Sequence, residues 1–135
     1  MRYISAALAF LFVVGGSSPR EKSGLCPKHI ESPDYSAVAR AAHVTGDVIL
    51  DVSINTDGNV SGAVAVTGAR ILSESALKNV RHWTFENPSR TPSSQRLTYE
   101  YKIEGEPGQT AFSTAFFDLP DRVKVTVNPI PINRD

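Results

Sequence analysis

Two runs of alternating hydrophobic and polar residues flank a short polar turn near the middle of the chain. They form the stretch ILDVSINTDGNVSGAVAV, residues 49–66. The turn Thr56-Asp57-Gly58-Asn59 contains residues that tolerate positive φ, which tight hairpins require. The pattern predicts a β-hairpin with one dry and one mostly wet face. The dry face is predicted to hold Val48, Leu50, Val52, Ile54, Val60, Gly62, Val64 and Val66.

Two segments with helical spacing flank this hairpin. In the first, Ser32 is predicted to cap a short helix and Pro33 to lie in its first turn. The helix would end at Thr45-Gly46. Its apolar face would contain Tyr35, Val38, Ala39 and Ala42. The second segment, ILSESALKNVRHW, predicts an amphipathic helix whose apolar stripe would contain Leu72, Ala76, Leu77, Val80 and Trp83.

Alternation returns in QRLTYEYKIEG, which predicts a third strand with Leu97, Tyr99, Tyr101 and Ile103 on one face. A similar pattern in DRVKVTVNP predicts a further strand over residues 121–128 of the tail. The order helix, strand, strand, helix, strand predicts an α+β fold. We expect two helices packed on one face of a three-stranded antiparallel sheet, which the tail strand could extend as a fourth.

The N-terminal residues have the pattern of a targeting segment. Arg2 precedes an apolar run from Ile4 to Val14, and small residues follow at 15–18. Such a run is short for a membrane span, so residues 1–18 are predicted to be a signal peptide, with an uncleaved signal anchor as the alternative. Residues 19–31 are predicted to be a flexible linker. The protein would therefore be exported to the periplasm, or anchored in the inner membrane if the signal is retained.

Composition and charge exclude several function classes. The 14 basic and 14 acidic residues balance, and no basic cluster suggests a nucleic-acid surface. Cys26 and His29 form a C-x-x-H pair, but they lie in the predicted linker, where nothing fixes their geometry. His29, His43 and His82 match no metal-site spacing. We therefore predict no enzyme activity, no cofactor and no metal.

Three segments together carry a resemblance to a known family. They are SPDYSAVARAAHVTGDVILDVSINTDGNVSGAVAV, ALKNVRHWTF and RLTYEYKI. The chain resembles the C-terminal domain of the TonB energy-transducer family over roughly residues 31–105. The domain would span residues 32–105, followed by a tail over residues 106–135.

The resemblance implies a non-enzymatic binding module of the periplasm, possibly linked to TonB-dependent transport. Members of the family bind an extended peptide of an outer-membrane transporter, which adds as a strand to the last strand of the sheet. Another envelope protein could supply the peptide here. The residues that the resemblance places at the peptide are Pro33, Tyr35, Arg96, Leu97, Thr98, Tyr99, Glu100, Tyr101, Lys102 and Ile103.

Two alternatives to peptide binding remain open at this point. Open edges of two copies could pair, which would give a homodimer. The tail strand could instead lie against residues 97–103, which would give a self-capped structural envelope protein without a transport role.

Overall fold

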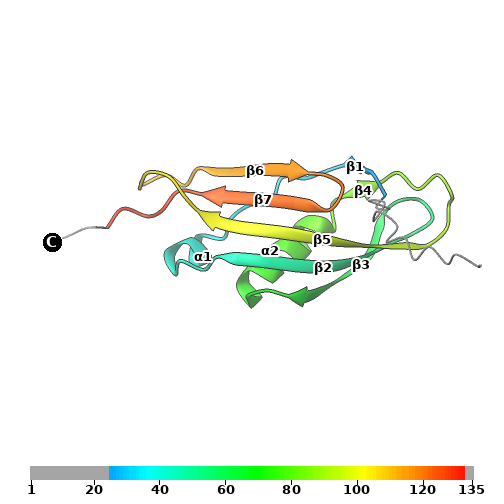
Figure 1. Ribbon diagram of the computed structural model, residues 1–135, viewed down its shortest axis with the longest axis horizontal. Coiled ribbons are helices and arrows are strands. Elements are labelled where there is room, and N and C mark those ends of the chain that lie inside the picture. Colours follow the sequence, from blue (N-terminus) through cyan, green and yellow to red (C-terminus); the bar gives the residue numbers. More distant parts are fainter. Residues whose placement is uncertain (1–24, 133–135) are drawn as a thin grey trace, which may run out of the picture.

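The computed structural model describes residues 25–132, which form two β-sheets and two helices (Figure 1). The elements in chain order are β1 (Pro27–His29), α1 (Ala37–Ala41), β2 (Gly46–Ile54), β3 (Val60–Thr67), α2 (Arg70–Val80), β4 (Thr84–Phe85), β5 (Ser93–Ile103), β6 (Ser113–Asp118) and β7 (Arg122–Val127). The predicted signal segment, residues 1–18, and the first residues of the predicted linker lie outside the described part.

The main sheet has five strands in the order β3-β2-β5-β7-β6, and a separate small sheet pairs β1 with β4. The expected three-stranded antiparallel sheet with two packed helices is therefore wrong. β6 and β7 form an antiparallel hairpin, and β7 lies parallel to β5. The sequence concealed β6 because STAFFD has two adjacent phenylalanines, of which Phe116 is exposed, so polar and apolar residues do not alternate along it.

The helices contribute less than the sequence predicts. α1 has only five residues, and Ser36 caps it by accepting a hydrogen bond from the Ala39 amide at 3.4 Å. The predicted cap at Ser32 is therefore wrong, and Pro33 lies before the helix rather than in its first turn. Val38, expected on the buried face of a longer helix, is 66% exposed.

α2 covers one face of the sheet, which we call the core face (Figure 1). Trp83 follows α2 and is buried beside Phe85, Tyr99 and Phe117, with ring centroids 6.0–6.1 Å away. The largest strand residues of the core face alternate along β2, β5 and β7, as strand geometry requires. They are Val48, Leu50, Val52, Ile54, Leu97, Tyr99, Tyr101, Val123, Val125 and Val127.

β3 presents its residues differently from the prediction. The β2–β3 register shifts between Ser53 and Ile54, and again between Ile49 and Leu50. Such irregularities change which residues face each side of a sheet. As a result Ala63 and Ala65 pack against the core, whereas Val64 and Val66, predicted to be dry, are 66% and 46% exposed.

The hairpin turn itself forms where predicted. Gly58 has φ of 87°, and an added Cβ there would lie 2.0 Å from the Phe85 carbonyl oxygen. Only glycine fits this position, because the turn lies directly against β4. The Phe85 amide donates to the Gly58 carbonyl at 2.7 Å, which fixes the turn to the small sheet.

Candidate functional site: the edge of strand β5

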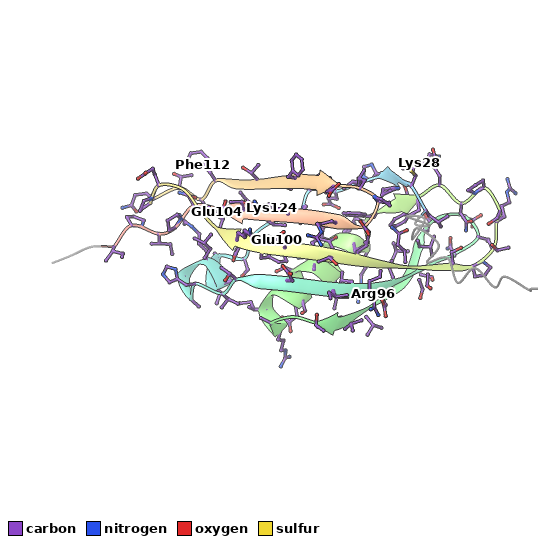
Figure 2. All side chains as sticks on the ribbon, in the orientation of Figure 1. Lys28, Arg96, Glu100, Glu104, Phe112 and Lys124 are labelled. Atoms are coloured by element: carbon purple, nitrogen blue, oxygen red, sulfur yellow. The ribbon has the colours of Figure 1, made fainter. Side chains whose placement is uncertain are left out.

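β5 contains eight of the ten residues that the family resemblance places at a peptide. Leu97, Tyr99 and Tyr101 point into the core and are fully buried. Arg96, Thr98, Glu100 and Lys102 alternate with them and lie on the opposite side of the sheet, which we call the open face. Figure 2 labels Arg96 and Glu100 on this face. The strand therefore separates a dry side from a charged side.

Both edges of β5 are paired in the structure. β2 runs antiparallel along one edge, from Gly46 opposite Tyr101 to Ile54 opposite Ser93. β7 runs parallel along the other edge, from Arg122 beside Thr98 to Val127 beside Ile103. The edge at which a peptide was expected is thus occupied by residues of the same chain.

Two main-chain hydrogen bonds bracket the contact between β5 and β7. The Thr98 amide donates to Asp121 O at 2.8 Å, and the Glu104 amide donates to Val127 O at 2.9 Å. Main-chain groups alternate in direction along a strand, so the even-numbered residues of β5 face β7. We call these groups, from Thr98 to Glu104, the β5 edge.

Pro33 and Tyr35, the other two predicted residues, are buried beneath the sheet. The Tyr35 hydroxyl donates to Val44 O, and its ring meets Tyr101 edge-on with centroids 5.4 Å apart. The structure therefore brings Tyr35 and Tyr101 together. Burial raises the pKa of Tyr35, and burial raises the pKa values of Tyr99 and Tyr101 further above the ordinary value.

The open face of β5 is a row of charged residues (Figure 2). Arg96 makes a two-pronged contact with Asp51 at 2.9 and 3.1 Å, and Lys102 contacts Glu100 at 2.7 Å. The Lys102 hydrogen bond lowers the pKa of Glu100, and the charges of Lys124 and Arg122 on β7 lower it further. The hydrogen bond from Arg96 likewise lowers the pKa of Asp51. The Arg96–Asp51 pair is exposed and the Lys102–Glu100 pair is partly exposed, so both add little to stability and leave the face hydrophilic.

Arg40 of α1, which the sequence analysis missed, holds the end of β7 in place. Its side chain is 7% exposed. The guanidinium donates to three carbonyls, those of Asn128 at 2.6 Å, Gly108 at 2.8 Å and Pro129 at 3.0 Å. No local sequence signal distinguishes this arginine from one on the polar face of a helix.

Asn79 of α2 is a second residue that the sequence analysis missed. Its Oδ1 accepts from Trp83 Nε1 at 3.0 Å and from the Tyr99 hydroxyl at 2.9 Å. Its Nδ2 donates to Glu31 O at 3.0 Å. Asn79 therefore joins α2, β5 and the segment before α1 through one side chain.

Other chemistry is sparse among residues 25–132. Cys26 is exposed with a free thiol. A cavity of about 230 Å³ lies between residues 31–36 and α2, with Lys78 and His82 on its helical side. Across the same residues no group of three or more His, Cys, Asp or Glu side chains is placed to hold a metal ion. No helix of this part has the length and apolarity to cross a membrane.

The comparisons with known proteins agree with the sequence resemblance. Residues 31–104 match the family model described as Gram-negative bacterial TonB protein C-terminal. A search of the curated proteins found no match. The family match ends one residue after β5, so β6 and β7 lie beyond it.

Proposed function

The chain belongs to the TonB C-terminal family, and we propose that it binds an extended segment of an envelope protein by β-strand addition. Domains of this family are non-enzymatic interaction modules of the Gram-negative envelope, and they contact outer-membrane transporters. The segment would pair with the β5 edge, and residues 96–103 would provide the contacts. The protein would act in the periplasm after export through residues 1–18.

One observation carries this proposal. Residues 122–127 lie outside the family match, yet they pair with the β5 edge as a parallel strand. The β5 edge can therefore accept an extended segment, and β7 has the geometry that a bound peptide would need. A partner segment would bind when the β6–β7 hairpin releases this edge.

The side chains of β7 indicate what such a segment must contain. Val123, Val125 and Val127 are buried at alternate positions against the core. Burying three such side chains contributes roughly 5 to 9 kcal/mol before entropy is subtracted. A competing segment must supply apolar residues at every second position, because it has to cover the same part of the core.

The same burial favours a second candidate function. If no partner replaces the buried contacts of these three valines, the β6–β7 hairpin stays on β5. The protein is then a self-capped structural component of the envelope. The two functions differ in whether β7 can leave β5.

A reversible disulfide that locks β7 onto β5 distinguishes the two candidate functions. Glu100 and Lys124 lie side by side on adjacent parallel strands, within the spacing that a disulfide spans. We would make Glu100→Cys with Lys124→Cys in a Cys26→Ser background. The probe is a fluorescent peptide of sequence DRVKVTVN, residues 121–128 of this chain. It is titrated to about millimolar concentrations, because the tethered strand competes at that order of effective concentration.

We expect the reduced form to bind the probe and the oxidised form to lose binding. The matched control is Thr114→Cys with Thr126→Cys, which locks β6 to β7 but leaves the hairpin free to separate from β5. The control should bind in both redox states. Equal binding by the oxidised and reduced forms of the first variant, or no binding by any form, would refute strand addition at the β5 edge.

A further inference from the structure

β6 is the last strand of the sheet, and its outer side pairs with no strand among residues 25–132 (Figure 1). The register of β6 with β7 is regular over all six residues, from Ser113 opposite Val127 to Asp118 opposite Arg122. A regular, unpaired strand of this kind is a template for a further strand.

The direction of the main-chain groups of β6 follows from its neighbours. Asp121 O and Val127 O face β5, so the even-numbered residues of β7 face β6. Phe116 lies opposite Lys124 and therefore bonds toward β7. The amides and carbonyls of Ser113, Ala115 and Phe117 consequently point outward, and we call them the β6 edge.

The β6 edge lacks the usual devices that block strand pairing. The strand STAFFD contains no lysine, no proline and no bulge. Phe112 and Phe116 are 71% and 67% exposed, and Figure 2 shows Phe112 beside the start of β6. β3, at the other side of the sheet, is irregular near both ends of its pairing with β2. β6 is therefore the more open of the two edges.

We propose that the β6 edge pairs with the β6 edge of a second copy of this chain. The strands would run antiparallel about a two-fold axis at Ala115, so that Ser113 faces Phe117 of the second copy. The three outward-facing residues of each strand would then exchange about six main-chain hydrogen bonds. The two five-stranded sheets would join into one continuous sheet.

The charges of the strand are compatible with this register. Asp118, the one charged residue of β6, lies opposite Arg122 of its own chain and would face Phe112 of the second copy. Phe116 would face Thr114, so no like charges meet. The formal net charge of the chain at pH 7 is zero, which removes long-range repulsion between copies.

Other registers fit less well. An axis at Phe117 would pair Ala115 with residue 119 and Ser113 with residue 121, which lie in the turn after β6 rather than in the strand. An axis at Ser113 would place the loop before β6 opposite the strand. The axis at Ala115 uses the whole of β6.

The area involved sets the strength of the dimer. A pair of six-residue strands buries less than the roughly 1,200 to 2,000 Å² of a standard stable interface. We therefore expect a reversible dimer that forms with rising protein concentration.

Cysteine cross-linking tests the register directly. In a Cys26→Ser background, Ala115→Cys places two thiols opposite each other across the axis, where a mild oxidant should give a covalent dimer. Ser113→Cys is the matched control, because residue 113 would face residue 117 of the second copy and lie far from its own counterpart. Cross-linking of the control as readily as Ala115→Cys would overturn the register.

Sedimentation of the full chain tests the dimer without cysteines. Ala115→Pro removes an amide of the β6 edge but none of the bonds to β7, and it should abolish the concentration-dependent rise in molar mass. Ala65→Pro, on the outer side of β3, should leave that rise unchanged. A chain that stays monomeric at high concentration and gives no Ala115→Cys cross-link would overturn the proposal.

This inference is independent of the proposed function. The Glu100→Cys and Lys124→Cys lock holds β7 on β5 and leaves the β6 edge untouched. The oxidised lock should therefore dimerise like the natural chain, whether or not the peptide probe binds.

Discussion

Replacing Arg40 by methionine should release the end of β7 from α1. Methionine keeps most of the apolar volume of the arginine stem but removes all three hydrogen bonds to Gly108, Asn128 and Pro129. A hydrogen bond from a charged donor contributes about 1.5 to 3 kcal/mol. The three carbonyls lie in partly exposed segments and can bind water in the variant. The free energy of unfolding should therefore fall by about 2 to 4 kcal/mol in total, less than three full contributions.

Urea unfolding, followed by the fluorescence of the single Trp83, measures this change. With a slope of about 2 kcal/mol per molar urea, the midpoint should fall by roughly 1 to 2 M. Arg70→Met is the matched control. Its partner Glu74 is one helical turn away on an exposed face, so that variant should lose only about 0.3 to 0.5 kcal/mol.

Hydrogen exchange shows whether the loss is local. In Arg40→Met, the amides near Glu104 and Val127 should exchange faster than those of β2. An unchanged midpoint, or a loss as small as that of Arg70→Met, would refute the view that Arg40 secures β7.

Three further predictions follow from the core and the sheet. Val64→Lys should change the free energy of unfolding by no more than about 0.5 kcal/mol, whereas Ala65→Lys should lower it by more than about 2 kcal/mol, because only residue 65 packs against the core. Equal urea midpoints for the two variants would contradict this. Asn79→Ala should lower the free energy of unfolding by about 2 to 4 kcal/mol in the same assay, because it leaves the indole N–H of Trp83 and the hydroxyl of Tyr99 unpaired in the core. A loss below about 1 kcal/mol would count against this role of Asn79. Burial raises the pKa of Tyr101 above its unfolded value of about 10, so the stability that neutral Tyr101 contributes is complete below pH 10 and is lost as the pH rises further. Tyr101→Phe should therefore lose less stability than the natural chain between about pH 9 and pH 11. Equal losses in the two proteins would contradict this.

The sequence predicted those parts of the fold that have a regular period. β2 and β5 alternate strictly between core and open face, so their existence and their buried sides were predictable. The strand at 121–128 was predictable for the same reason and lies at residues 122–127. The resemblance to the TonB C-terminal family, confirmed by the match over residues 31–104, came from spaced motifs within these same elements.

The remaining features depend on tertiary contacts that leave little local signal. The sides that Val64 and Val66 face are set by irregularities in the β2–β3 register, which no period reveals. α1 begins only at Ala37, after the Ser36 cap, whereas Tyr35 before it bonds to Val44, nine residues away in the chain. β1 and β4 are too short to show a period.

The candidate site was predictable only in part. The residues of the β5 edge followed from the family resemblance, but β7 runs parallel to β5 because the β6 strand precedes it and reverses the chain. β6 itself was hidden because its two adjacent phenylalanines, of which only Phe117 packs on the core, break the alternation of polar and apolar residues. Arg40 bonds to Asn128, 88 residues away in the chain, and such contacts cannot be inferred from local pattern.

Amide exchange along β5 and β6 at low protein concentration tests the central claim most directly, namely that β7 occupies the β5 edge. We predict slow exchange for the amides of Thr98, Glu100 and Lys102, comparable to those of β2, and fast exchange for the outward-facing amides of Ala115 and Phe117. Fast exchange at Thr98, Glu100 and Lys102 would show that the β5 edge is open in solution and would contradict the account.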